Sequence, residues 1–355
     1  MQSDRRDAIN SQRGILMSQK AKVAVVIGRF QIVHSGHVAL LKRAYEVAES
    51  VVVIIGSVDK PRTIKDPFSF EERELMLAPY LKTNTKECVA GVPDSRYNDE
   101  EWVYNVQSTV YDLIGTERDV VLVGHSKDES SFYLKLFPQW GFEEVSQFGN
   151  KESATDYRDT YFREGIGLTP NDLPESTRLF LRDFRATNDF LNLADEWEFI
   201  RDYKESWSAA PYAPTFVTAD AVVVQAGHIL LVQRRAAPGK GLWAFPGGFV
   251  NQHEKVFDAA LRELREETKL KVPEAVLRGS LRASRVFDDP SRSLRGRTIT
   301  HAFLFNLQPM GVLPVVKGSD DAIKAKWISL YEFFNMRNVM FEDHFDMGIN
   351  LVGRL

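Results

Sequence analysis

The sequence has one cysteine, no long apolar run and no excess of basic residues. A lone cysteine, Cys88, excludes a disulfide within the chain and any zinc site built from several cysteines. Its place in the short apolar run 88–92 predicts a buried core thiol rather than a nucleophile. No stretch approaches the about 18 apolar residues that a membrane-spanning helix needs. Because the first 22 residues also lack the apolar segment of a secretion signal, we expect a cytoplasmic protein without a membrane partner.

Positive charge is not in surplus either. The chain carries 45 Lys and Arg against 49 Asp and Glu, a formal net charge of −4. Proteins that bind nucleic acid usually show a basic excess, so we expect no nucleic-acid partner. What the sequence does have is 355 residues with 44% hydrophobic side chains, enough for about two globular domains. These numbers leave homo-oligomerisation open.

The first half alternates between apolar runs and helical patterns. Four apolar runs, at 23–27, 51–56, 88–92 and 120–124, indicate buried strands, and helical patterns occur at about 37–49, 70–78 and 99–114. Such alternation is typical of an α/β fold with a parallel sheet, whose ligands bind beyond the carboxyl ends of the strands. We therefore expect an active site near residues 28–37 and 124–125.

The second half changes pattern after a helical stretch at about 174–208. Two prolines within 208–214 break that stretch, and the domain boundary is placed there. Beyond it we expect a hairpin that turns at Ala226-Gly227, strands near 275–287 and 298–307, a strand at 326–328 and a final helix. The expected division is a flexible tail at 1–20 and domains at 21–207 and 208–355.

The first expected strand ends in Gly28, and a helix is expected to begin near Gly36. A helix N-terminus offers unpaired N–H groups and a partial positive charge, both suited to phosphate. His34 and His37 lie three residues apart and can both face that space as donors. The pattern His34-Ser35-Gly36-His37 resembles the HxGH motif of the nucleotidyltransferase superfamily, which implies a Rossmann-like N-terminal domain.

Two further segments resemble the archaeal-type nicotinamide-mononucleotide (NMN) adenylyltransferases. Gly28-Arg29-Phe30-Gln31 resembles their entry to the HxGH motif, and the segment 153–158, Ser-Ala-Thr-Asp-Tyr-Arg, resembles their S-x-T-x-x-R motif. The resemblance implies transfer of AMP from ATP to NMN with Mg²⁺, giving NAD and pyrophosphate; nicotinate mononucleotide is the alternative acceptor. The implied catalytic residues are His34, His37 and Arg158, and the implied ATP- and NMN-binding residues are Gly28, Arg29, Phe30, Gly36, Gly124, Ser153, Thr155, Trp102 and Asn98. Trp102 either faces the nicotinamide ring or packs in a helix core.

Three glutamates share one face of a helix expected at about 256–268. Glu263, Glu266 and Glu267 stand at i, i+3 and i+4, a crowding of like charge that a divalent cation bound by carboxylate oxygens would relieve. Upstream, Gly247-Gly248 permits a tight loop that brings Glu254 toward them. Arg262 lies four residues before Glu266 and can orient it.

The spacing from Gly248 to Glu267 resembles the Nudix box of hydrolases that cleave nucleoside diphosphates linked to another group. The resemblance implies an α/β/α domain with a mixed sheet. It also implies that Glu263, Glu266 and Glu267 hold Mg²⁺ or Mn²⁺, which polarises the diphosphate. One letter departs from the pattern: Lys269 stands where the family usually has glycine, which we expect to affect the end of the helix.

Segments outside the box resemble Nudix members that recognise ADP-ribose. They are 214–217, 241–246, 284–292 and 294–297, and the last two are rich in arginine. The resemblance implies hydrolysis of ADP-ribose to AMP and ribose 5-phosphate, with an acidic residue of 318–322 assisting the attacking water. The implied ADP-ribose-binding residues are Arg285, Phe287, Arg292, Arg295 and Arg297, with Phe287 stacked on adenine. Another nucleoside diphosphate derivative, or an ADP-ribose sensor without turnover, is the alternative.

The two patterns together resemble the bacterial bifunctional NMN adenylyltransferase/Nudix hydrolases, over about residues 20–350. The pairing implies an enzyme of NAD synthesis and salvage whose partners are the small molecules ATP, NMN, NAD and ADP-ribose. Intact glutamates at Glu263, Glu266 and Glu267 favour an enzyme over a sensor.

Overall fold

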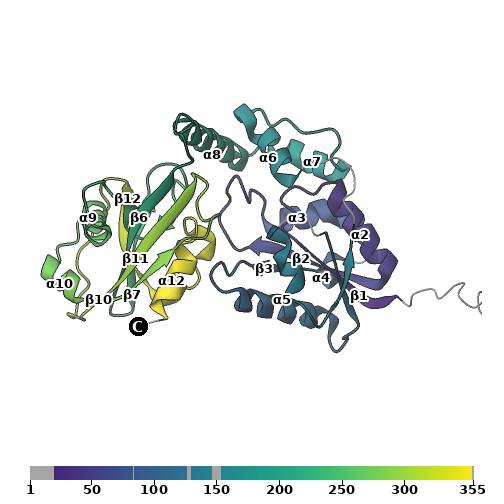
Figure 1. The fold of residues 1–355 in the computed structure, drawn as a ribbon, viewed down its shortest axis with the longest axis horizontal. Coiled ribbons are helices and arrows are strands. Elements are labelled where there is room, and N and C mark those ends of the chain that lie inside the picture. Colours follow the sequence, from purple (N-terminus) through teal and green to yellow (C-terminus); the bar gives the residue numbers. More distant parts are fainter. Residues whose placement is uncertain (1–19, 83, 126–128, 146–152, 354–355) are drawn as a thin grey trace, which may run out of the picture.

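The structure is a computed structural model that describes residues 20–82, 84–125, 129–145 and 153–353. Most of the tail expected at 1–20 therefore lies outside the described residues. Two α/β bodies lie side by side, one running from β1 to α8 and the other from β6 to α12, with α8 above their junction (Figure 1). The α/β class expected for both halves is confirmed. Among the described residues, no helix combines the length and apolarity required to cross a membrane.

The N-terminal domain contains a five-stranded sheet in the order β3-β2-β1-β4-β5, and all its strand pairs are parallel. The strands are β1 (Ala21–Gly28), β2 (Ala48–Val58), β3 (Val89–Pro93), β4 (Val120–Gly124) and β5 (Gly141–Glu144). The edge strand β5 was not predicted, because its short segment is mostly exposed and has no apolar run. Cys88 is buried as expected, although it ends a helix rather than starting β3.

Helices cover both faces of this sheet. The α-helices are α2 (Ser35–Val47), α3 (Phe70–Leu77), α4 (Thr85–Cys88), α5 (Asp99–Ile114), α6 (Ala154–Phe162), α7 (Glu175–Phe184) and α8 (Asn188–Glu205). Three 3₁₀ turns are η1 (Ala78–Tyr80), η2 (Glu129–Lys135) and η3 (Arg163–Gly165). One core packs α2, α3 and α6 to α8 against alternate residues of β1 and β2, and a second core packs α5 and η2 against the others. The expected helices at 70–78 and 99–114 are confirmed to within one residue.

The C-terminal domain is built on a mixed sheet in the order β10-β11-β6-β7-β12; β8 pairs with β7, and β9 with β6. Among the described strands of this sheet, β6 and β11 pair in parallel and the other strand pairs are antiparallel. The strands are β6 (Thr215–Gln225), β7 (His228–Arg234), β8 (Trp243–Ala244), β9 (Gly247–Phe249), β10 (Leu281–Phe287), β11 (Arg297–Leu307) and β12 (Ala322–Ser329). Residues 226 and 227 both have positive φ, the geometry of a two-residue hairpin turn, as predicted.

Helices also enclose this second sheet. They are α9 (Val256–Thr268), α10 (Glu274–Gly279), α11 (Leu330–Phe333), η4 (Arg337–Val339) and α12 (His344–Val352). One core joins α9 and α10 to the sheet and another joins α11 and α12, which gives the expected α/β/α layering. The strand expected near 275–287 begins only at Leu281, because α10, which follows Pro273 as its N-cap, occupies the first part of that segment.

A loop of the N-terminal domain is embedded in the C-terminal domain. The loop 94–98 joins β3 to α5, and the ring of Tyr97 packs on Phe287 with the ring centroids 5.0 Å apart. Arg96 pairs with Asp289 at 2.9 Å, and Arg337 Nη1 donates to the carbonyl oxygen of Asp94 at 2.9 Å. The carboxyl edge of the parallel sheet, where ligands bind in such folds, therefore faces the C-terminal domain.

Candidate active sites

His34 and His37 lie together at the start of α2. His34 is the N-cap, and its Nδ1 accepts from the amide of Gly36 at 3.1 Å. The amide of His34 donates to Nδ1 of His37 at 3.2 Å, and the ring centroids are 3.9 Å apart. Because both Nδ1 atoms accept, each neutral ring carries its proton on Nε2. Burial, followed by the charge of His34, lowers the pKa of His37 well below its usual value, so that ring is a neutral N–H donor at neutral pH.

The turn before α2 is fixed by buried contacts. Phe30 has a φ of 52° and is almost fully buried, with its ring centroid 4.9 Å from that of His37. A Cβ on Gly28 would stand 3.0 Å from that ring, so a larger residue there would press on Phe30. Phe30 was predicted to bind nucleotide, but its buried ring positions His37 and leaves only its backbone to face a ligand.

The second N-terminal motif meets the first through Arg158. Its guanidinium donates to the carbonyl oxygen of Gln31 at 2.8 Å and to Thr155 Oγ1 at 3.0 Å. The ring centroids of Tyr157 and His34 are 6.0 Å apart. Burial and the nearby charge of Arg29 lower the pKa of Arg158 to about 10. Arg158 and Arg29, two cations from distant segments, therefore lie near the start of α2, and this arrangement suits an anion.

The serine of that motif has a local partner as well. Ser153 caps α6, where its Oγ is hydrogen-bonded to Asp156, while Thr155 is exposed in the first turn. At the end of β4, a Cβ on Gly124 would stand 2.6 Å from Leu134, so that position needs glycine for packing. Because Arg158 of α6 donates to the carbonyl oxygen of Gln31 just after β1, α6 lies near the same edge of the sheet as the end of β4.

Asn98 and Trp102 occupy the first turn of α5. Asn98 is the N-cap, and its side-chain oxygen accepts from the amide of Glu101 at 3.2 Å. Trp102 is half-buried, with its ring centroid 6.0 Å from that of Tyr133 and 5.9 Å from that of Phe137. One part of the tryptophan therefore packs in the core and the rest stays accessible.

The loop between β2 and α3 contains charged residues that the sequence motifs did not reveal. Buried Asp66 lies 2.8 Å from Lys60 and 3.7 Å from Arg29. Although burial alone would raise the pKa of Asp66, Lys60 and Arg29 hold it at about 2. The only signal in the sequence for this cluster is its position after β2, at the edge where a site was expected.

On α9 the three glutamates share one face, as predicted. Arg262 donates to Glu254 at 2.7 Å, to Glu263 at 2.8 Å and to Glu266 at 2.9 Å. The amide of Gly247 donates to Glu267 Oε2 at 3.0 Å. A Cβ on Gly248 would stand 2.4 Å from Glu263 Oε1. The two glycines thus let the β9 backbone approach the carboxylates, and Arg262 holds Glu254 beside them.

The pKa values of these glutamates bear on whether they can bind a cation. Burial, against the opposing hydrogen bond from Gly247, raises the pKa of Glu267 to about 8, and burial also raises the pKa of Glu263. Within the described residues, no three acidic, histidine or cysteine side chains converge on a common point as metal ligands would. The donor set nevertheless fits a hard divalent cation, because its charge would offset the cost of ionising buried carboxylates.

Asp220 on β6 is a neighbouring acid that the motifs did not indicate. It is buried, accepts a hydrogen bond from the hydroxyl of Thr300, and would lie 2.2 Å from a Cβ on Gly247. Burial raises its pKa to about 6.

Lys269, the irregular position of the box, ends α9 in the left-handed region with a φ of 52°, where glycine is usually favoured.

Three of the five residues expected to bind ADP-ribose lie in the domain interface instead. Phe287 is fully buried against Tyr97, which leaves no ring face for adenine. Arg285 lies over the rings of Tyr97 and Phe287, at 5.8 and 5.2 Å from their centroids. Arg292 is buried and donates two hydrogen bonds to Asp343, at 2.8 and 3.0 Å. The sequence could not show these roles, because Tyr97 and Asp343 come from distant segments.

Arg295 and Arg297 are the other two residues expected to bind ADP-ribose. Arg295 lies over Phe249, the residue after Gly248, with 5.3 Å between the guanidinium carbon and the ring centroid. It also lies 4.0 Å from Glu342. Arg297 lies 3.8 Å from Asp288 and is more exposed. Arg295 therefore lies over the β9 residue that follows Gly248, and Arg297 lies at the start of β11.

Comparisons with known proteins match both halves. A family model described as NUDIX domain matches residues 214–347, and one described as Cytidylyltransferase-like matches residues 25–125. The nicotinamide/nicotinic acid mononucleotide adenylyltransferase of Acinetobacter baylyi is 34% identical over 175 residues, covering 49% of this chain and 92% of that protein. The ADP-ribose pyrophosphatase of Methanocaldococcus jannaschii is 34% identical over 128 residues, covering 36% of this chain and 66% of that protein.

Solved structures match the whole arrangement. A crystal structure of a bifunctional NMN adenylyltransferase/ADP ribose pyrophosphatase from Francisella tularensis has a TM-score of 0.88 and 35% identity, covering 94% of this chain and 99% of that one. The same Francisella protein complexed with AMP and Mn ion gives a TM-score of 0.87 and 34% identity, with the same coverage. The similarity thus includes the placement of both domains.

Proposed function

The chain belongs to the family of bifunctional NMN adenylyltransferase/ADP-ribose pyrophosphatases, and from this premise we propose that it catalyses both reactions, one in each domain. The N-terminal domain, proposed as residues 21–207, transfers AMP from ATP to NMN. The C-terminal domain, proposed as residues 208–355, hydrolyses ADP-ribose to AMP and ribose 5-phosphate. The observation that carries the proposal is the meeting of His34, His37 and Arg158 in one domain and of Glu263 and Glu267 in the other.

In the first reaction a phosphate oxygen of NMN attacks the α-phosphorus of ATP. The bond from that phosphorus to the α,β-bridging oxygen breaks, and pyrophosphate leaves. No protein nucleophile is needed, so the chain acts by positioning and charge stabilisation. The neutral Nε2–H groups of His34 and His37 donate to phosphate oxygens, and Arg158 and Arg29 offset the negative charge. Mg²⁺ bound with ATP would neutralise further charge.

The ends of β4 and α6 supply the remaining contacts of this site. The backbone at Gly28, Gly36 and Gly124 contacts the nucleotide, and Ser153 and Thr155 stand at the N-terminus of α6, which suits phosphate. The accessible part of Trp102, next to Asn98, faces the nicotinamide ring of NMN. A substrate panel containing NMN and nicotinate mononucleotide separates the two possible acceptors.

In the second reaction water attacks a phosphorus of the ADP-ribose diphosphate and the phosphoanhydride bond breaks. Glu263, Glu266 and Glu267 would hold a divalent cation, Mg²⁺ or Mn²⁺, and such an ion would supply positive charge to the diphosphate and acidify the attacking water. Arg262 holds Glu254 and orients Glu266. Arg295 and Arg297 contact the diphosphate. Arg285 and Phe287 instead pack against Tyr97 of the N-terminal domain, and Arg292 pairs with Asp343.

The partners of this chain are then small nucleotides, and its setting is the cytoplasm, where NMN and ATP are both available. The test is product chromatography of the purified full chain with NMN plus ATP and, separately, with ADP-ribose and Mg²⁺ or Mn²⁺. We expect NAD and pyrophosphate from the first mixture, and AMP and ribose 5-phosphate from the second. Metal-independent binding of ADP-ribose without release of AMP would instead identify the C-terminal domain as a sensor.

A further inference from the structure

The connection 288–297 between β10 and β11 carries two residues of the hydrolase site. Arg295 lies within it and Arg297 ends it, and both are proposed to contact the diphosphate of ADP-ribose. Residues 288–296 form turns and bends rather than helix or strand. Such a connection takes its conformation from side-chain contacts, so those contacts determine how well Arg295 is placed.

The N-terminal domain holds the first half of this connection. Arg96 Nη1 donates to Asp289 Oδ1 at 2.9 Å and to Ser291 Oγ at 3.2 Å. The same Asp289 oxygen accepts from the amide and the hydroxyl of Ser291, both at 2.8 Å. The side chains of Arg96 and Asp289 are only 17% and 28% exposed, so this ion pair is better shielded from water than a surface pair. Arg96 therefore fixes the turn 289–291.

Tyr97, the next residue of the same loop, acts on either side of that turn. Its ring packs on Phe287, the residue before the connection, and its hydroxyl donates to Asp343. Asp343 in turn accepts from Arg292 at 2.8 and 3.0 Å. The N-terminal domain thus contacts the connection directly at residues 289 and 291 and through Asp343 at residue 292.

The residue beside Asp343 reaches Arg295. Glu342 lies 4.0 Å from Arg295 and has a φ of 46°, a left-handed conformation that is uncommon for a residue with a side chain. Two neighbouring carboxylates therefore meet two arginines of the connection, Asp343 at Arg292 and Glu342 at Arg295. Contacts from the N-terminal domain end three residues from the arginine proposed to bind the diphosphate.

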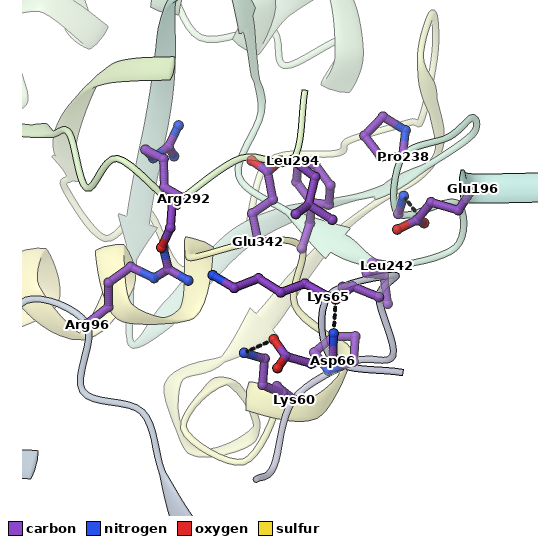
Figure 2. Close-up of a pocket in the computed structure, with 15 residues that line it drawn as sticks. Lys60, Lys65, Asp66, Arg96, Glu196, Pro238, Leu242, Arg292, Leu294 and Glu342 are labelled. Atoms are coloured by element: carbon purple, nitrogen blue, oxygen red, sulfur yellow. Dashed lines mark hydrogen bonds and ion pairs between the residues drawn. The ribbon is translucent and has the colours of Figure 1, made fainter. Parts of the chain in front are cut away.

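Unfilled space adjoins the connection. A cavity with an empty volume of about 620 Å³, its open mouth included, has Arg96 in its N-terminal wall and Arg292, Leu294 and Glu342 in its C-terminal wall (Figure 2). Because side chains do not fill this space, they do not hold the connection from that side. Loss of the Arg96 contacts would leave the connection free to shift into the cavity.

We propose that Arg96 of the N-terminal domain is a positioning residue of the hydrolase, which holds the connection 288–297 so that Arg295 is aligned for ADP-ribose. This inference rests on the proposed function of the C-terminal domain. Arg96 acts through the connection and does not touch ADP-ribose. The affinity of the second domain for its substrate thus depends on a residue of the first, while the α9 glutamates do not.

Steady-state hydrolysis of ADP-ribose by the full chain tests this role. Arg96→Met removes the donors to Asp289 and Ser291, so we expect the KM for ADP-ribose to rise about 3- to 10-fold with kcat within about twofold of wild type. Arg96→Lys should recover part of the affinity, because an ammonium can still pair with Asp289. Arg182→Met, at an exposed arginine of α7 that pairs with Asp183, is the matched control and should keep the wild-type KM.

An unchanged KM in Arg96→Met, an equal rise in Arg182→Met, or a loss confined to kcat overturns the positioning role. Asp289→Asn weakens the same contact from the other domain and should raise the KM to a similar extent. It keeps the proposal testable if Arg96→Met does not fold, and a wild-type KM in Asp289→Asn also overturns it.

A pair of substitutions tests whether Arg96 acts through Arg295. Arg295→Met alone should raise the KM for ADP-ribose about 10- to 100-fold, because it removes a charged donor to the diphosphate. Adding Arg96→Met should then raise the KM no further, since the guanidinium that Arg96 positions is already gone. Multiplication of the two single effects in the double variant would overturn this route.

Failure of the proposed function gives a different result. The wild-type chain would then release no AMP from ADP-ribose with Mg²⁺ or Mn²⁺. Failure of the positioning role alone leaves wild-type hydrolysis intact and the KM of Arg96→Met unchanged.

Discussion

The hydroxyl of Tyr97 in the N-terminal domain donates a hydrogen bond to the carboxylate of Asp343 in the C-terminal domain. The same carboxylate accepts two hydrogen bonds from Arg292, and both residues of that ion pair are buried. Burial, together with the charge of Asp343, raises the pKa of Tyr97, so the phenol stays protonated and donates throughout the ordinary pH range. A residue of the first domain thus completes a buried polar network of the second.

Tyr97→Phe should destabilise the C-terminal domain. The substitution keeps the ring that packs on Phe287 but leaves a lone pair of the buried Asp343 carboxylate without its donor, at a cost of about 1–3 kcal/mol. Denaturant unfolding followed by tryptophan fluorescence measures the change. Tyr104→Phe, on the exposed face of α5, is the control and should leave the free energy of unfolding unchanged. Equal stabilities of the two variants would contradict this account of the interface.

His37→Ala should abolish NAD formation and spare ADP-ribose hydrolysis. It removes an N–H donor to phosphate and the acceptor for the amide of His34, so a loss of about 10²- to 10³-fold in kcat is expected. The measurement is NAD production from NMN and ATP at saturating substrate. His228→Ala, at the first residue of β7 in the C-terminal domain, serves as the control. Loss of hydrolysis in His37→Ala would argue against two separate sites.

Glu267→Gln should give the converse result. The amide keeps a side-chain oxygen for the hydrogen bond from Gly247 but cannot offer a charged oxygen to the metal, so hydrolysis should fall by about 10²- to 10⁴-fold. Release of AMP from ADP-ribose is the readout, and chelation of divalent ions should produce a comparable loss in the wild-type chain. Glu274→Gln, on exposed α10, should retain full hydrolysis. Wild-type turnover in Glu267→Gln would remove this glutamate from the metal site.

His344 predicts how stability depends on pH. Burial lowers its pKa from 6.5 to about 3, and its Nδ1 accepts from the amide of Phe245 at 3.0 Å. Since the unfolded chain then binds the proton more tightly than the folded one, this contribution is complete above pH 6.5 and is lost as the pH falls toward about 3. One such group adds a slope approaching about 1.4 kcal/mol per pH unit.

Urea unfolding of the wild type and of His344→Gln at pH 7.5 and pH 5.5 checks this prediction. Glutamine retains an acceptor for Phe245 but does not titrate, so the free energy of unfolding should fall less between the two pH values in the variant. Parallel changes in the two proteins would show that His344 does not contribute.

Local patterns in the sequence were sufficient for much of the fold and for the centre of each site. Glu263, Glu266 and Glu267 lie close together because they share one helix, and His34 and His37 because they share one helix start. Their geometry depends on spacing of a few residues, which a single sequence displays directly. The turn at Ala226-Gly227 was predictable for the same reason.

Roles that depend on a distant partner were not predictable in this way. Phe287 and Arg292 were predicted to contact a ligand. In the structure Tyr97 packs on Phe287, and Asp343 pairs with Arg292. Asp66 gave no motif signal, because its partners Lys60 and Arg29 are brought to it by folding. The edge strand β5 was missed since its exposed residues carry no apolar pattern.

The embedded loop 94–98 also bears on how such a protein can evolve or be divided. Producing the two halves as separate chains, divided in the exposed connection 206–214, would remove Tyr97 from beside Phe287 and expose an aromatic surface. Either half alone would then need substitutions at this contact to remain soluble. The fusion of the two activities is therefore hard to reverse, because each domain buries side chains against the other.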